Sequence, residues 1–146
     1  MRIDLGGRVA VVTGSTRGIG RAIAETRAGC GARVAADGRA AGKAGEVAAA
    51  LGGEARGFAC DVADVASVAK LVENVEQAFG AIDILVNNAG ITRDAYFLMM
   101  TAGNWEELMR THLDAVFHCS KAVVRGMCAA RRGVIINIGS GSAMSP

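Results

Sequence analysis

Short apolar runs and amphipathic segments alternate along the whole chain. The apolar runs, which we expect to be β-strands, cover residues 9–12, 33–36, 57–60, 82–86 and 134–138. The segments between them have helical spacing of apolar residues or are rich in Ala, and they predict helices at residues 19–28, 40–51, 65–79 and 104–130. Strands that alternate with helices are typical of β-α units, so the pattern predicts a parallel sheet covered by helices.

Two of the predicted helices show their boundaries or faces clearly. Asp64 is a suitable N-cap for the third helix, whose apolar residues recur every three or four positions. These residues are Val65, Val68, Leu71, Val72, Val75 and Phe79. After a loop at residues 87–100, the longest helix is expected to present one broad apolar face made of Trp105, Leu108, Met109, Leu113, Val116, Phe117, Val123, Val124 and Met127.

Composition and charge exclude several classes of protein. The 146 residues suit a single domain, the net charge is only +2, and no basic block is present, so nucleic acid is not an expected partner. No apolar run approaches the roughly 18 residues of a membrane span, and we expect a cytoplasmic protein. The four cysteines lie far apart, and we expect reduced core thiols instead of disulfides or metal ligands: Cys30, Cys60, Cys119 and Cys128.

A glycine-rich segment at residues 13–20 follows the first strand and opens the first helix. Backbone N–H groups at such a position can converge on a phosphate, and glycines let the phosphate approach closely. The segment is not a P-loop, because Arg21 and Ala22 stand where Lys and Ser or Thr would be required. A tight strand-to-helix turn without a ligand is the alternative.

Two motifs together carry a family resemblance. Thr13-Gly14-x-x-x-Gly18-x-Gly20 combined with Asn87-Asn88-Ala89-Gly90 resembles the paired signature of short-chain dehydrogenases/reductases. The stretch at residues 83–94 is most similar to the branch of 3-oxoacyl-(acyl-carrier-protein) reductases. The resemblance implies a three-layer α/β Rossmann fold with strand order 3-2-1-4-5. It also implies NADPH-dependent reduction of a 3-oxoacyl thioester or similar ketone, with the substrate in some cases carried on acyl carrier protein.

The resemblance also implies which residues hold the cofactor. Asn88, Ala89 and Gly90 would lie against the adenosine ribose. Asp61 would accept a hydrogen bond from the adenine amino group and Val62 would lie against the ring; a turn or capping residue before the next helix is the alternative role of Asp61. The full expected set is Gly14, Ser15, Arg17, Gly18, Ile19, Gly20, Arg39, Asp61, Val62, Asn88, Ala89 and Gly90.

The charges near the second strand favour NADP(H) over NAD(H). An NAD-specific site has a carboxylate at the end of this strand, and alignment by residues 31–34 puts Gly38 there. Arg39 follows it, and Arg17 in the glycine segment is a second guanidinium group that suits a 2′-phosphate. Asp37 is one position away, and a shift of register by one residue would reverse this preference.

Catalytic residues are expected only in part. Ser140 matches the family's serine that binds the substrate carbonyl, whereas the family's Tyr-x-x-x-Lys would come after Pro146. Tyr96 has no Lys four residues later. His112 stands where the family has an Asn in a proton relay, and it could also be a simple helix-surface or core residue. We therefore expect residues 1–146 to be a single Rossmann domain that is incomplete at its C-terminus.

Two further expectations concern packing. Arg27 occupies a position in the first helix where an apolar residue is expected, so the helix should be rotated, frayed or paired with an acid. A domain that ends after the fifth strand would leave residues 134–138 as an apolar sheet edge, with Leu108, Val116 and Val123 partly uncovered. We expect a homo-oligomer or pairing with a complementary segment. A non-catalytic NADP-binding module and an inert truncation product are the alternative interpretations.

Overall fold

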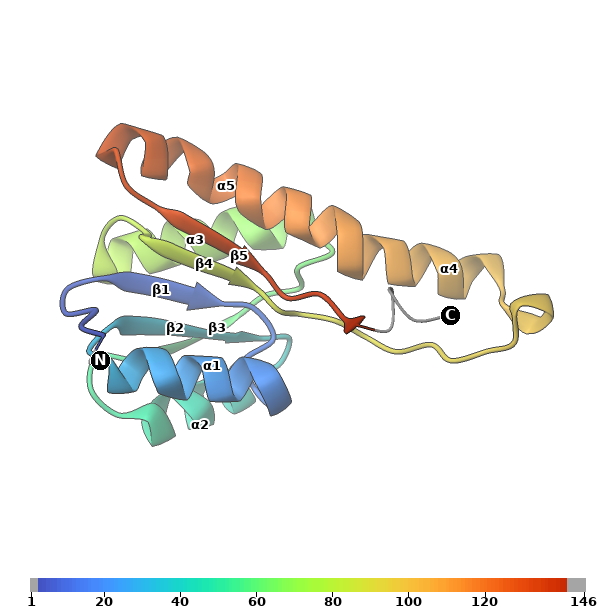
Figure 1. The fold of residues 1–146 in the computed structure, drawn as a ribbon, viewed down its shortest axis with the longest axis horizontal. Helices are drawn as coiled ribbons and strands as arrows, with labels where there is room; N and C mark the ends of the chain where they lie inside the picture. The colour runs from blue at the N-terminus through green and yellow to red at the C-terminus, as the bar shows by residue number, and fades with distance from the viewer. Residues whose placement is uncertain (1–2, 142–146) are drawn as a thin grey trace.

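The computed structural model describes residues 3–141, which form one parallel five-stranded sheet with helices on both faces (Figure 1). The strand order is β3-β2-β1-β4-β5, so the predicted Rossmann topology is confirmed. The strands are β1 (Val9–Val12), β2 (Arg33–Gly38), β3 (Arg56–Ala59), β4 (Ile84–Asn87) and β5 (Val134–Asn137). The helices are α1 (Gly18–Gly29), α2 (Ala41–Leu51), α3 (Val65–Phe79), η1 (Phe97–Met99), α4 (Ala102–Met109), η2 (Arg110–Asp114) and α5 (Ala115–Ala130).

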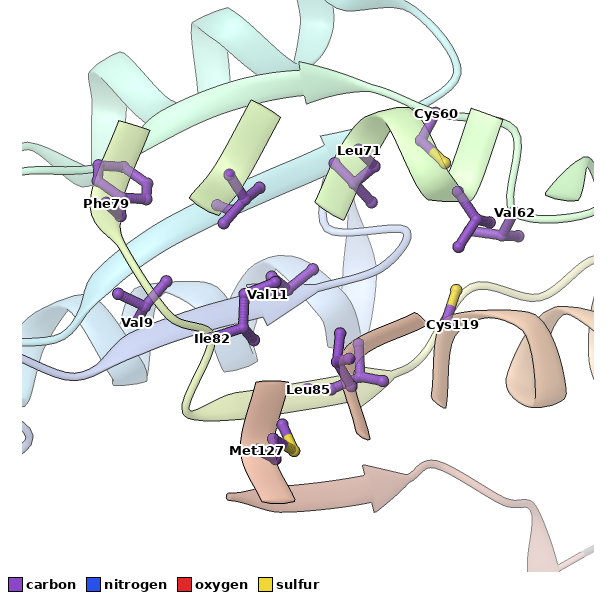
Figure 2. Close-up of a cluster of buried hydrophobic side chains, with 14 of the residues drawn as sticks. Val9, Val11, Cys60, Val62, Leu71, Phe79, Ile82, Leu85, Cys119 and Met127 are labelled. Carbon is purple, nitrogen blue, oxygen red and sulfur yellow. The ribbon is translucent and has the colours of Figure 1, made fainter. Parts of the chain in front are cut away.

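The sheet lies between two helical layers. Helices α1 and α2 cover one face, and α3 and α5 cover the other (Figure 1). Figure 2 shows the second of these interfaces, where Val9, Val11 and Leu85 of the strands face Leu71 and Phe79 of α3. Burial on both faces explains why the central strands β1 and β4 read as continuous apolar runs.

A buried carboxylate fixes the start of β4. The prediction began this strand at residue 82, but Ile84 is its first residue, and Asp83 just before it accepts a hydrogen bond from Val9 N at 3.0 Å. Arg8 and Arg132 form ion pairs with Asp83 at 3.3 and 2.6 Å. Burial alone would raise the pKa of Asp83, but the Val9 N–H bond and the two arginines outweigh it and lower this pKa.

The long helix predicted at residues 104–130 is not continuous. It consists of α4 and α5 joined by η2, one turn of π-helix that contains His112. A π turn inserts an extra residue and shifts the helical face, so the residues before and after it do not share one stripe. The predicted single broad apolar face is therefore wrong.

The face that α5 buries is a row with a spacing of four residues. Its buried members are Ala115, Cys119, Val123 and Met127, whereas Phe117 and Val124 are exposed. Trp105 and Leu113, before α5, are also exposed. The expectation that Val123 lacks cover is wrong, because only 2% of its surface is exposed.

Arg27 does not disrupt α1, which runs unbroken to Gly29. Its side chain is partly buried, and its Nε has no hydrogen-bond partner among the described residues. Within residues 3–141, no acidic side chain therefore accepts a hydrogen bond from Arg27 Nε, as one of the expectations required. A buried donor without a partner costs on the order of 1–3 kcal/mol, which other contacts must offset.

The prediction of core thiols is correct for two of the four cysteines. Cys60 and Cys119 are buried, and burial raises the pKa of Cys60 to about 11 and that of Cys119 to about 12. Cys30 is half-buried and Cys128 is exposed. Within residues 3–141, no group of three or more His, Cys, Asp or Glu side chains could hold a metal ion, and no helix is long and apolar enough to span a bilayer.

Candidate functional site

A cleft of about 500 Å³ opens at the carboxyl ends of the central strands. It lies where β1 is followed by a crossover to β2 on one side while β4 pairs with β1 on the other, the position at which α/β sheets bind ligands. All members of the predicted cofactor set except Ser15 line this cleft. Sequence reasoning missed Thr16, Ala63, Ile91, Glu107, Arg110 and Thr111, which line it too.

Two of the glycines are required by packing within the protein. Gly14 has φ +63°, and a Cβ there would lie 2.8 Å from Ala89 Cα. A Cβ on Gly20 would collide with Asn88 Nδ2 and with the carbonyl of Gly14. These two glycines therefore allow the turn after β1 to pack against the segment after β4, a reason that the sequence alone did not reveal.

Gly18 is different, because a Cβ there would meet nothing within 4 Å. Its φ of +56° still favours glycine, and it is the first residue of α1. Arg17, the N-cap residue, makes no side-chain capping bond, so its side chain does not satisfy the first N–H groups of α1. Open space beside such a helix start suits an anion.

Thr13 links the two motifs, and sequence reasoning gave it no role. Its Oγ1 accepts hydrogen bonds from the backbone N–H groups of Asn88 and Ala89, both at 3.0 Å. In return, Asn88 Nδ2 donates to the carbonyl oxygens of Thr13 and Gly14 at 2.9 and 3.2 Å. The segment after β4 is therefore fastened to the glycine turn by side-chain to backbone bonds.

Ser15 is turned away from the cleft and is fully buried. Its Oγ accepts a hydrogen bond from Asp37 N at 2.8 Å and donates to Asp37 O at 3.3 Å. The side chain of Ser15 thus connects the glycine turn to β2, and it does not line the space that a cofactor would use.

The end of β2 forms the floor of the cleft. The strand is two residues longer than predicted, and Asp37 is buried within it, paired with Phe58 of β3. Asp37 Oδ2 accepts one long hydrogen bond from Gly14 N at 3.4 Å, and its Oδ1 has no partner among the described residues. Burial raises the pKa of Asp37 to about 7, because it outweighs the backbone N–H groups of Gly14 and Gly38, which lower this pKa.

Gly38 and Arg39 follow at the cleft wall. A Cβ on Gly38 would collide with Thr16 Cγ2, so this position is fitted to the glycine turn. Arg17 and Arg39 are both exposed and both line the cleft, which brings together the two guanidinium groups that the sequence selected.

Asp61 and Val62 line the cleft after β3. Asp61 Oδ1 accepts a hydrogen bond from Ala63 N at 3.0 Å, so the alternative turn role exists in the structure beside the cleft position. The cap of α3 is Asp64, whose carboxylate accepts from the N–H groups of Ala66 and Ser67, as predicted.

His112 and Ser140 lie outside the residues that line the cleft. His112 is in η2, its Nε2 is 2.7 Å from Ile91 O and 3.2 Å from Ile91 N, and a Cβ on Gly90 would lie 2.8 Å from its Cε1. The imidazole is thus held against the segment that follows β4. Ser140 is exposed and lies three residues beyond the end of β5.

Comparisons with known proteins agree with this geometry. The family model for short chain dehydrogenases matches residues 8–146. The 3-oxoacyl-[acyl-carrier-protein] reductase of Haemophilus influenzae is 48% identical over 92% of this chain and 55% of its own length. The Escherichia coli K12 enzyme of the same name is 46% identical over the same shares of both chains.

A solved structure gives the same result for the fold. The Sinorhizobium meliloti 1021 protein, which is assigned to the short-chain alcohol dehydrogenases, superposes with a TM-score of 0.93 at 35% sequence identity. The match covers 100% of this chain and 59% of that one. The chain spans just over half the length of the relatives that it matches. The paired glycine and Asn-Asn-Ala-Gly motifs, the strand order and these matches show that the chain belongs to the short-chain dehydrogenase family.

Proposed function

We propose that the cleft binds NADP(H) and that the protein reduces a 3-oxoacyl thioester or a similar ketone to the 3-hydroxy compound. The observation that carries the proposal is the cleft wall, where Arg17 and Arg39 are exposed and Gly38 offers no carboxylate. Two guanidinium groups suit a 2′-phosphate, and a glycine at the strand end removes the group that would repel it. The activity and the substrate class come from the 3-oxoacyl-[acyl-carrier-protein] reductases that the chain resembles.

The described residues fit such a cofactor. The open space at Gly18 leaves room for the pyrophosphate at the start of α1, with Gly14, Ile19 and Gly20 in the same turn. Asp61 and Val62 would hold the adenine, and the ribose would lie against Asn88, Ala89 and Gly90. When bound, the reduced nicotinamide supplies the hydride for the carbonyl carbon of the substrate.

In this proposal Ser140 donates a hydrogen bond to the substrate carbonyl and holds it in place. Asn87 Nδ2 donates to Asn137 Oδ1 at 2.8 Å and joins β4 to β5, which steadies the strand that leads to Ser140. His112 would help to hold the segment after β4 in place through its contact with Ile91 O. A proton donor of the Tyr-x-x-x-Lys type does not occur within the 146 residues.

The test is an assay of NADPH oxidation with an acetoacetyl thioester, on the 146-residue chain and on the product of the complete reading frame. We expect activity only where a Tyr-x-x-x-Lys is present, and a loss of 100-fold or more in kcat for Ser140→Ala, on the order of one catalytic hydrogen-bond donor. Robust reduction by the 146-residue chain alone, abolished by Ser140→Ala, would require another proton donor, with His112 the first to examine.

A non-catalytic NADP-binding module is the second candidate function. The presence of a Tyr-x-x-x-Lys, which the 146 residues do not contain, separates this candidate from the enzyme. A reading frame without that motif, together with NADPH binding and no reductase activity, would select it over the enzyme. For the enzyme we also propose a cytoplasmic location and acyl carrier protein as the substrate's carrier.

A further inference from the structure

The contacts of the Asp37 carboxyl group do not explain why a carboxyl stands at this position. Only 1% of the residue surface is exposed, Oδ2 accepts one bond at 3.4 Å, and Oδ1 accepts none from the described residues. The backbone of Asp37 joins β2 to the glycine turn, since its N–H donates to Ser15 Oγ and its carbonyl accepts from Ser15. A buried carboxyl with one long bond is unfavourable for stability, and a neutral amide would fit the same space.

The groups around Asp37 do not offset the cost of burying its negative charge. From β3 and the turn after it, Cys60 and Asp61 face it, and Asp61 adds negative charge. From α5, Cys119 lies near enough for Asp37 to raise its pKa. Arg17 and Arg39 share the cleft with Asp37, but no Lys, Arg or His forms an ion pair with Asp37 in the described part of the chain.

The carboxyl group of Asp37 changes its protonation near neutral pH. Its pKa of about 7 arises first from burial, with Asp61 raising it further. Near neutral pH the carboxyl is therefore divided between a neutral and a charged form. A negative charge brought into the cleft would favour the neutral form, because two like charges in a poorly solvated space repel.

We propose that Asp37 is a specificity-determining residue whose proton controls how strongly this cleft holds the 2′-phosphate end of the cofactor. The inference rests on the proposed function, because it presumes that NADP(H) occupies the cleft. Neutral Asp37 leaves the attraction of Arg17 and Arg39 for the phosphate unopposed. Ionised Asp37, one residue from Gly38 on the cleft floor, opposes that attraction, so cofactor binding takes up a proton.

The test is calorimetric titration of the purified chain with NADPH and with NADH between pH 6 and pH 9. Asp37→Asn, in which the amide keeps the shape of the side chain, is titrated in parallel, because the 2′-phosphate of NADPH itself ionises at about pH 6 and its binding to both proteins strengthens as it does so. We expect the ratio of the native Kd for NADPH to that of Asp37→Asn to rise by about tenfold over this range, on the order of one charge interaction, and the same ratio for NADH to rise less. Identical slopes for the two proteins would overturn the proposal.

Proton uptake gives a readout that does not depend on a variant folding. At pH 7.5, the enthalpy of NADPH binding to the native chain should vary with the ionisation enthalpy of the buffer, and that of NADH binding should vary less. Equal proton uptake with both cofactors would overturn the role of Asp37. Absence of NADPH binding at pH 6 in both proteins would instead refute the proposed function, on which this inference rests.

Discussion

Two buried carboxylates, Asp37 and Asp83, respond to pH in opposite directions. The folded-state pKa of Asp37 is raised to about 7, so the unfolded chain loses its proton first and the free energy of unfolding falls as pH rises from about 4 to 7. The pKa of Asp83 is lowered, so the contribution of Asp83 to the free energy of unfolding is lost as pH falls below the usual range of aspartate.

We predict that Asp37→Asn raises the free energy of unfolding at pH 8 by roughly a few kcal/mol and leaves it nearly unchanged at pH 4.

Denaturant unfolding at the two pH values measures this difference. Asp94→Asn is the matched control, because it makes the same carboxylate-to-amide change at a residue that lies exposed in the loop after β4. A lower stability of Asp37→Asn at pH 8 would show that the charged carboxylate is compensated after all.

Thr13 gives the second residue-scale prediction. Thr13→Val keeps the shape of the side chain but removes the acceptor for the N–H groups of Asn88 and Ala89. We expect a loss of about 2–3 kcal/mol in the free energy of unfolding, because these donors lose their partner. Thr13→Ser keeps the hydroxyl and should lose about 1 kcal/mol. Equal losses in thermal or denaturant melts would contradict the hydrogen-bond account.

For single residues, the sequence predicted membership of the cleft better than it predicted the contacts that each side chain makes. Arg17, Arg39 and Asp61 line one cleft because turns after parallel strands meet at one edge of the sheet, and their roles in cofactor binding stay predictions. The inward direction of Ser15 and the depth of Asp37 depend on the close contact between the glycine turn and β2. That contact joins segments over 20 residues apart, and no local pattern encodes it.

Among the elements, α1 owes its position to Gly20. A Cβ there would collide with Asn88 Nδ2, so Gly20→Ala should push α1 away from the segment after β4 and cost about 2 kcal/mol of stability. Gly29, at the other end of the same helix, has nothing within 4 Å of its Cβ position. Gly29→Ala should leave stability unchanged or raise it by up to about 1 kcal/mol. If both variants melt alike, the collision at Gly20 does not position the helix.

Element boundaries and types were predicted well where burial sets the pattern. The five strands and α1, α2 and α3 all lie within a few residues of their predicted ranges. The π turn at residues 110–114 was missed, because a run of apolar residues can satisfy a continuous helix and an interrupted one equally well. Leu113 and Phe117, which are exposed, were consequently assigned to the same apolar face as the buried Val123 and Met127.

For the whole molecule, the apolar surface predicts self-association. In the described residues β5 pairs only with β4, and Val134 and Ile138 are 54% and 38% exposed. Leu113 and Phe117 add exposed apolar surface near the start of α5. We expect sedimentation of the 146-residue chain at micromolar concentration to show dimers or larger species, and Val134→Lys to shift them towards monomer. A monodisperse native monomer with a sharp melt would contradict this.

We propose that the cleft binds a 2′-phosphorylated dinucleotide, and a comparison of affinities at pH 7 tests this most directly. NADPH and NADH are titrated into the native chain, into Arg39→Ala and into Arg21→Ala. Arg21 is the matched control, because it is an exposed arginine that pairs with Glu25 on α1 outside the cleft. We predict that the native chain and Arg21→Ala bind NADPH at least tenfold more tightly than NADH, and that Arg39→Ala loses most of this difference. Equal affinities of the native chain for the two cofactors, unchanged in Arg39→Ala, would contradict the claim.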